Sequence, residues 1–249
     1  MKMIFYAIHT LLFTFSVGFP SAALPQSNWE KTGGPIGGLG YDVRIDPTDN
    51  NIMYVTDNWS GVNKSLNAGS TWFASNTGID VDAGPTGDAV PIFSLTIDPN
   101  NSARLWAGTN GEGDNIGIFR SDDGGDTWEL KLNGITLGND LGIVFRGFTI
   151  QQGNSDLVYA MAEVPTDIWG WEFNRVKGKV YKTNDAGENW VEIWDGDNLA
   201  RYLFIDPSNQ EILYLSTGIF DREAFNSDCA NGISGGVGVL KSVDGGETW

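Results

Sequence analysis

The sequence contains a single cysteine, Cys229, and a single histidine, His9, among its 249 residues. One cysteine excludes a disulfide within the chain and a cluster of thiolate ligands. The lone histidine lies within the first 23 residues, which we expect to be removed. A chain without histidine excludes Ser-His-Asp and Cys-His mechanisms and histidine metal sites. Any catalysis must then use carboxylates, tyrosines, lysines or oxygen-bound metals.

Basic residues are also scarce, since 15 Lys and Arg face 32 Asp and Glu and give a formal net charge of −17. This charge repels phosphate backbones and anionic lipids, so the sequence predicts neither a nucleic-acid partner nor a membrane-surface partner. It also disfavours polyanionic substrates. The partners that fit are a neutral glycan or another exported protein.

Long apolar runs are absent except at the N-terminus, where residues 4–19 follow Lys2 and precede Pro20 and the small residues Ser21, Ala22 and Ala23. This arrangement is typical of a secretory signal peptide, and about 16 apolar residues are short for a membrane span. We expect residues 1–23 to be the signal, with an uncleaved anchor as the alternative. The mature chain, residues 24–249, is then secreted or periplasmic and does not insert into the membrane.

An eight-residue motif, Ser/Thr-x-Asp/Asn-x-Gly-x-Thr/Asn-Trp, occurs four times. The copies are SLNAGSTW (65–72), SDDGGDTW (121–128), TNDAGENW (183–190) and SVDGGETW (242–249). They start at residues 65, 121, 183 and 242, so the intervals are 56, 62 and 59 residues. Recurrence at nearly constant spacing indicates a repeat protein.

Each repeat also predicts four short antiparallel strands. Two apolar segments around a polar turn, Asp-Pro in three of four cases, occur at 41–56, 93–108, 146–161 and 201–216. A third strand precedes each octet and a fourth begins at its tryptophan, while no helical period occurs outside the signal. Four-stranded units in tandem are typical of an all-β fold, a β-propeller, in which each repeat is one blade.

A structural role is predicted for the octet. Its Asp or Asn can accept hydrogen bonds from amides of the turn, its glycine can adopt a positive φ, its hydroxyl can tie the loop to the strand, and its Trp can wedge between strands or blades. Asn67 and Asn189 suit a turn better than a catalytic group. The residues given this role are Ser65, Asn67, Gly69, Trp72, Ser121, Asp123, Gly125, Trp128, Thr183, Asp185, Gly187, Trp190, Ser242, Asp244, Gly246 and Trp249.

These octets resemble the BNR repeat, or Asp-box, of sialidases, sortilin-type receptors, photosystem II assembly factors and xyloglucanase-type family 74 glycoside hydrolases. The resemblance covers nearly all of residues 28–249 and implies a propeller with each box between the third and fourth strands of a blade, away from the active face. It is specific for fold and weak for function. A sialidase is disfavoured because Asp46, not proline, follows Arg44 and Ile45.

The two ends of the chain bear on the number of blades. Asn28 and Trp29 resemble the end of a box, so the chain begins with a fourth strand and stops where another fourth strand is due. Either four blades close on themselves, or the four repeats are part of a larger, truncated propeller. Because four blades are at the small end of the known range, we expect the second.

Function is expected where the blades differ. In TDNWSG (56–61), Asp57 beside Trp59 pairs a carboxylate with an aromatic platform, although an ordinary loop aspartate with a packing tryptophan is the simpler interpretation. The resemblance to xyloglucanase-type enzymes implies a catalytic aspartate here, in a Thr-Asp-x-Gly-Gly segment. Asp57 matches it, but the stretch after Asp57 is one residue longer and lacks the glycine pair.

Two further segments, both expected as loops, are candidates. Residues 163–179 carry Trp169 and Trp171 around a glycine, and a flexible loop of this kind suits ligand stacking or capping of the sheet. In residues 109–117, Glu112 and Asp114 could hold calcium, but no EF-hand spacing is present and a solvated turn is favoured. We therefore predict no metal or other cofactor.

Two classes of function remain open. One is a secreted propeller that binds a glycan or assembles with a protein, without complete catalysis. The other is the N-terminal part of a xyloglucanase-type glycoside hydrolase, in which two carboxylates flank the scissile bond. The resemblance implies that the partner of Asp57 lies in a second propeller.

Overall fold

The structure is a computed structural model. It describes residues 33–34, 40–57, 60–83, 88–111, 116–137, 142–169, 172–196, 199–217 and 238–249. Thr32–Trp249 forms one compact unit, and the predicted signal, residues 1–23, lies outside the described residues. In the described part of the chain, no helix is long and apolar enough to span a membrane.

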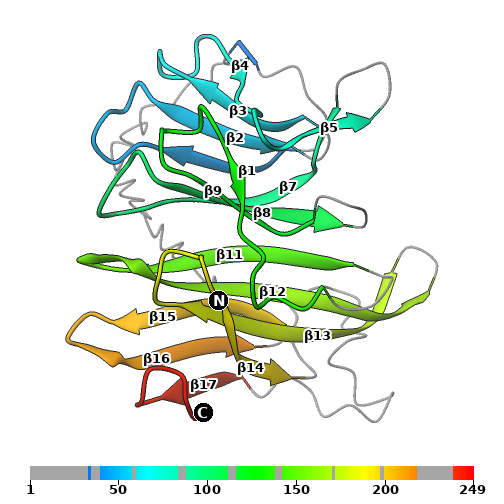
Figure 1. Ribbon diagram of the computed structural model, residues 1–249, viewed down its shortest axis with the longest axis vertical. Helices are drawn as coiled ribbons and strands as arrows, with labels where there is room; N and C mark the ends of the chain where they lie inside the picture. Colours follow the sequence, from blue (N-terminus) through cyan, green and yellow to red (C-terminus); the bar gives the residue numbers. More distant parts are fainter. Residues whose placement is uncertain are drawn as a thin grey trace, which may run out of the picture. The chain divides into compact units, whose positions relative to one another are not determined.

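The strands group into four successive antiparallel blades, as the repeats predict (Figure 1). Blade 1 consists of β1 (Gly40–Ile45), β2 (Met53–Asp57), β3 (Gly61–Ser65) and β4 (Phe73–Ala74). Blade 2 consists of β7 (Ile92–Ile97), β8 (Leu105–Gly111), β9 (Ile118–Ser121) and β10 (Glu129–Leu130). Blade 3 consists of β11 (Ile143–Gln151), β12 (Asn154–Trp169), β13 (Glu172–Thr183) and β14 (Val191–Gly196). Blade 4 shows β15 (Ala200–Asp206), β16 (Asn209–Thr217) and β17 (Val239–Ser242).

Two features depart from the simple repeat. A small hairpin, β5 (Asp80–Ala83) with β6 (Asp88–Ala89), lies in the connection between blades 1 and 2. Blades 2 and 3 also share a ladder, because Ile143 and Val144 of β11 pair with the end of β8. The two blades therefore form one continuous eight-stranded sheet.

Short polar turns join the first two strands of each blade. In blades 1, 2 and 4 the aspartate of the turn accepts an amide hydrogen bond two residues later, at 2.7 Å in Asp46, 2.8 Å in Asp98 and 2.8 Å in Asp206. This is the Asx-turn geometry that Asp-Pro sequences favour. Blade 3 has no such aspartate and turns instead through Gly153, with φ of 80°.

Each octet occupies the turn that follows the third strand of its blade, and we call these turns boxes 1 to 4. In every box the fourth-position amide donates to a carbonyl just before or within the second strand of the same blade, at 2.7–3.0 Å. The four boxes therefore lie on one side of the blades, which we call the box face. The second strands end on the other side, the opposite face.

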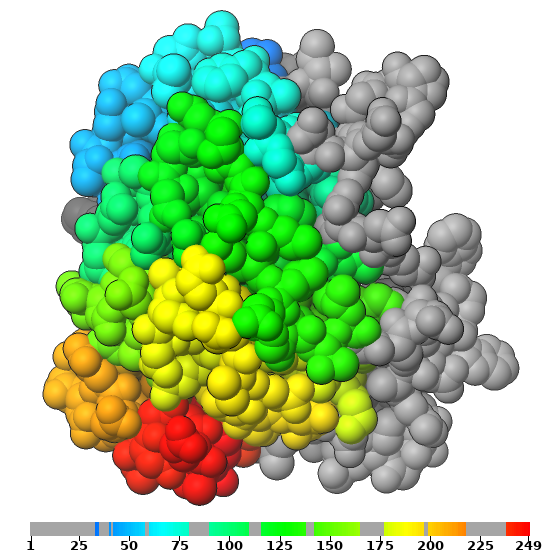
Figure 2. Space-filling model, in the orientation of Figure 1, coloured from blue at the N-terminus to red at the C-terminus, as the bar shows by residue number. Residues whose placement is uncertain are grey.

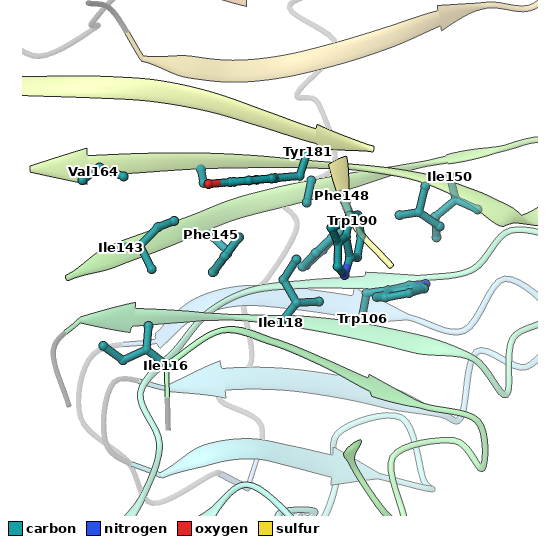
Figure 3. Close-up of a cluster of buried hydrophobic side chains, with 13 residues drawn as sticks. Trp106, Ile116, Ile118, Ile143, Phe145, Phe148, Ile150, Val164, Tyr181 and Trp190 are labelled. Atoms are coloured by element: carbon teal, nitrogen blue, oxygen red, sulfur yellow. The ribbon is translucent and has the colours of Figure 1, made fainter. Parts of the chain in front are cut away.

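The hydrophobic cores lie between consecutive blades. One cluster joins Tyr54 and Val62 of blade 1 to blade 2, and another joins Tyr159 and Val180 of blade 3 to blade 4. Between blades 2 and 3, Trp106 packs edge-on to Trp190 at 5.8 Å between ring centroids (Figure 3). Because each blade buries its face against the next, stability depends on neighbours, as in other repeat folds.

Candidate functional site

The four boxes have nearly the same internal hydrogen bonds. The Ser or Thr at the first position accepts the amide of the glycine four residues later at 2.8–2.9 Å, and its hydroxyl donates to the Asp or Asn at the third position. That third residue accepts the amide of the seventh residue at 2.8–2.9 Å. The carboxylates Asp123, Asp185 and Asp244 are therefore engaged in their own turns, which is a structural arrangement.

The box tryptophans differ in burial. Trp128 is 6% exposed and Trp190 is 3% exposed, whereas Trp72 and Trp249 are half-buried. The Trp128 indole donates to the carbonyl of Ser75 in the preceding blade at 2.8 Å. The Trp72 indole donates to Gly69 of its own turn at 2.9 Å. The Trp249 indole likewise donates to the carbonyl of Ile193 in the preceding blade, at 3.2 Å, although the ring is only half-buried.

Box hydrogen bonds also lower carboxyl pKa values. Side-chain hydrogen bonds from Asn189 and Thr183 hold the pKa of Asp185 below its ordinary value, and a bond from Thr248 lowers that of Asp244 to about 2. A carboxyl whose folded pKa is depressed contributes stability above its unfolded pKa and loses it as the pH falls through the folded pKa. We expect the free energy of unfolding to fall between about pH 4 and pH 2.

In the Asp123→Asn, Asp244→Asn double variant, the free energy of unfolding should fall less steeply with acid pH, because asparagine does not titrate. The turn should tolerate the change, since box 1 already uses Asn67 with the same bond to the seventh amide. At pH 7 its stability should stay within about 1 kcal/mol of the parent. Urea titrations from pH 2 to pH 7 measure both quantities, with Asp123→Ala as the comparison that removes the acceptor. An unchanged acid slope would show that other groups govern acid unfolding.

On the opposite face, Asp57 ends β2 and is 3% exposed. Its cross-strand partner is Gly61, and the same register position in the other blades holds Thr109, Ala162 and Thr217. Asp57 is therefore a buried carboxylate where the other blades carry neutral residues. This difference distinguishes blade 1 at the level where the second strands end.

The predicted aromatic partners are only partly placed. Trp59 and Trp171 lie outside the described residues, and for Trp169 the structure describes only the backbone, as the last residue of β12. The prediction of a flexible loop over 163–179 is wrong for most of its length. β12 and β13 continue as a hairpin whose last pair is Trp169 with Glu172, because apolar residues such as Val164, Ile168 and Val176 favour extended backbone.

An ion pair that sequence reasoning missed lies in blade 3. Arg146 binds Glu163 through two hydrogen bonds of 2.7 and 2.6 Å, and its guanidinium stands 5.0 Å from the ring centroid of Phe93 in blade 2. The Glu163 side chain is 4% exposed. Arg146 sits at a register shift in β11, and every blade has such a shift in its first strand. A β-bulge changes the direction in which a side chain points. The eight-residue motif does not include the first strand of the blade, so it could not predict this bulge or the ion pair.

A groove of about 650 Å³ crosses the first strands of blades 2 to 4. Thr96, Thr149 and Gln151 contribute polar groups to it, and Tyr202 and Phe204 of β15 contribute aromatic rings that are 65% and 66% exposed. The volume suits a small ligand. None of the predicted site residues lines this groove.

The calcium candidates Glu112 and Asp114 fall in residues 112–115, outside the described residues. Within the described ranges, no group of three His, Cys, Asp or Glu side chains is placed to hold a metal ion.

Known proteins resemble this chain in sequence and in fold. The BNR/Asp-box repeat family matches residues 119–130, which contain box 2. The xyloglucanase Xgh74A of Acetivibrio thermocellus is 27% identical over 251 residues, covering 89% of this chain and 27% of that protein. The chain thus spans about a quarter of the length of the curated relative that it matches.

Solved structures agree on the fold. An ancestral GH74 enzyme matches with a TM-score of 0.56 at 21% identity, over 86% of this chain and 24% of the other. The GH74 enzyme of Niastella koreensis matches with 0.55 at 23% identity, over 83% and 28%. The GH74 xyloglucanase of Xanthomonas campestris matches with 0.52 at 20% identity, over 83% and 29%. The chain therefore has the β-propeller fold of part of the GH74 enzymes, contains a BNR/Asp-box repeat at residues 119–130, and is similar in sequence to a xyloglucanase.

Proposed function

We propose that this chain is the propeller part of an exported protein that binds a neutral β-glucan on its opposite face, with Asp57 at the centre of the site. The observation that carries this proposal is the burial of Asp57 at the end of β2, where the other blades have neutral residues. The similarity to a protein named xyloglucanase supports the substrate class. A formal charge of −17 favours a neutral polymer over a polyanion.

In the sequence, Trp59 follows Asp57 by two residues and Trp171 follows Trp169 by two residues. Trp169 is the last residue of β12, which extends from the same face. Aromatic rings stack on the C–H surfaces of sugars without requiring charge. We therefore assign ligand binding to these tryptophans, and orientation of a sugar hydroxyl or acid–base chemistry to Asp57.

Complete hydrolysis requires a second carboxylate about 5–9.5 Å from the first. Glu163 is a poor candidate, because both of its oxygens are bound by Arg146. We propose that the chain alone binds but does not turn over its ligand. The alternative, the N-terminal part of a xyloglucanase-type hydrolase, places the second carboxylate in another propeller.

The proposal is tested by titrating the exported chain with xyloglucan oligosaccharides and with an unbranched soluble β-glucan. Trp59→Ala should weaken binding about tenfold, which corresponds to about 1.4 kcal/mol. Asp57→Asn, which keeps the side-chain shape, should change affinity less. Phe73→Ala is the control, because Phe73 is an exposed aromatic next to box 1.

Equal binding by the parent and the Trp59 variant would remove Trp59 from the site. Hydrolysis of xyloglucan by this chain that survives Asp57→Asn would contradict the assignment of Asp57. Binding that is lost equally in the Phe73 variant would place the ligand on the box face instead.

A further inference from the structure

The register shifts in the first strands occur at the same position of every blade, close to the opposite face. Each shift follows the pair that joins the first strand to the second strand near its end, namely Gly40–Asp57, Ile92–Thr109, Phe145–Ala162 and Ala200–Thr217. The residues that the shifts leave unpaired are Tyr41, Phe93, Arg146 and Arg201. A bulge changes the direction of a side chain, so these positions differ from the rest of the strand.

The bulge residues of blades 2 to 4 lie on neighbouring strands. The blades follow one another in chain order in the space-filling view, from blue to red (Figure 2). The first strands of consecutive blades contact one another, β7 with β11 and β11 with β15, so they form the inner edge of the propeller. The guanidinium of Arg146 stands 5.0 Å from the ring centroid of Phe93. Phe93, Arg146 and Arg201 therefore lie at the centre of the opposite face.

Arg146 is held in a fixed orientation by Glu163. Its Nε and Nη2 donate to the two carboxylate oxygens at 2.7 and 2.6 Å, and the Glu163 side chain is 4% exposed. A bidentate pair of this kind fixes the plane of the guanidinium. Nη1 makes no hydrogen bond with the described residues, although the Arg146 side chain is 21% exposed. An oriented N–H donor is thus available to an acceptor outside the protein.

Arg201 places a second guanidinium at the bulge of the next blade. Its side chain is partly buried, and it makes no hydrogen bond or ion pair with any residue that the structure describes. Partial burial removes water from the guanidinium without supplying a protein acceptor. A ligand oxygen at this position would restore the lost hydrogen bonds.

The formal charges at this level of the opposite face cancel. Asp57 and Glu163 are acidic, and Arg146 and Arg201 are basic. All four lie where the second strands end or directly beside that level. Donors that carry no net charge between them suit hydroxyl oxygens better than carboxylates or phosphates, because an anion gains no net attraction there.

We propose that Arg146 and Arg201 donate hydrogen bonds to hydroxyl oxygens of the ligand, and that Glu163 is a positioning residue that orients Arg146 and cancels its charge. This inference rests on the proposed function, since it adds residues to the same glycan site. It also defines the ligand more narrowly. Glu163 makes the site select a neutral, hydroxyl-rich oligosaccharide over one that carries carboxylates.

The test measures the affinity of the full chain for two probes, an unbranched β-glucan oligosaccharide and the same oligosaccharide oxidised to a carboxylate at C6. Arg201→Gln should weaken binding of the neutral probe about tenfold, because a charge-assisted hydrogen bond is lost. Its control is Lys241→Gln, which removes an exposed cation of blade 4 next to box 4, away from this site. The control should leave the affinity unchanged.

Glu163→Gln tests the positioning role. It leaves the charge of Arg146 uncompensated, so the affinity for the carboxylated probe relative to the neutral probe should rise about fivefold. Glu247→Gln makes the same change in net charge at an exposed position of box 4 and should not alter this ratio. Replacing Arg146 alone would strand a buried carboxylate. Arg146 is therefore tested in the double variant Arg146→Met, Glu163→Gln, which should weaken binding of the neutral probe about tenfold.

The outcomes separate this inference from the proposed function. A parent chain that binds neither probe would overturn both. A parent that binds the neutral probe, with an affinity that neither Arg201→Gln nor the double variant changes, would overturn this inference alone. A probe ratio that Glu163→Gln and Glu247→Gln raise equally would remove the positioning role of Glu163, since only the net charge would then matter.

Discussion

Replacing Trp128 by alanine is expected to cost on the order of 3–5 kcal/mol of unfolding free energy. The indole is 6% exposed and belongs to the cluster between blades 1 and 2, which includes Tyr54, Ile79 and Leu95. Its nitrogen donates to the carbonyl of Ser75 at 2.8 Å. The substitution therefore opens a cavity at a junction between blades and removes a buried hydrogen bond.

Trp72→Ala is the matched control in the same motif. Trp72 is half-buried, and its indole bonds to Gly69 of its own turn. Truncation there should cost clearly less, because the cavity is open to solvent and no other blade loses a partner. Urea denaturation followed by circular dichroism gives both values. A loss below about 1 kcal/mol for Trp128→Ala would show that this side chain is peripheral.

The second large effect is expected for Gly134→Ala, in the connection that follows β10. Gly134 has φ of 87°, and a β-carbon built on it collides with the backbone carbonyl of Trp190. The left-handed backbone alone costs an alanine roughly 1–2 kcal/mol. The collision adds to this cost, because the carbonyl belongs to the backbone of box 3 and cannot turn aside as a flexible side chain can. We expect a total loss of at least about 3 kcal/mol.

Gly153→Ala separates the two contributions. Gly153 has φ of 80°, close to that of Gly134, but nothing lies within 4 Å of the position that an alanine methyl group would take there. Its alanine variant should lose only the conformational part. Thermal and urea unfolding of the two variants give the difference directly. Equal losses would show that the contact between Gly134 and box 3 relaxes freely.

The sequence by itself determined the blades and the boxes. Ser121, Asp123, Gly125 and Thr127 bond to one another within eight residues, so their geometry is local and a short motif predicts it. The strands follow for a similar reason, since alternating apolar residues around Asx-turns favour hairpins wherever they occur. The fourfold repetition then indicated a propeller.

Only the tertiary structure decided how the blades meet and what they bury. Arg146 reaches Glu163 and Phe93 through a register shift in β11, and Asp57 is buried at the level where other blades are neutral. The extension of β12 and β13 depends on pairing between residues that a motif does not link. These features rest on register and on packing between separate blades. Such contacts join residues roughly one repeat apart, and their energy depends on the neighbouring blade, which local sequence preferences do not encode.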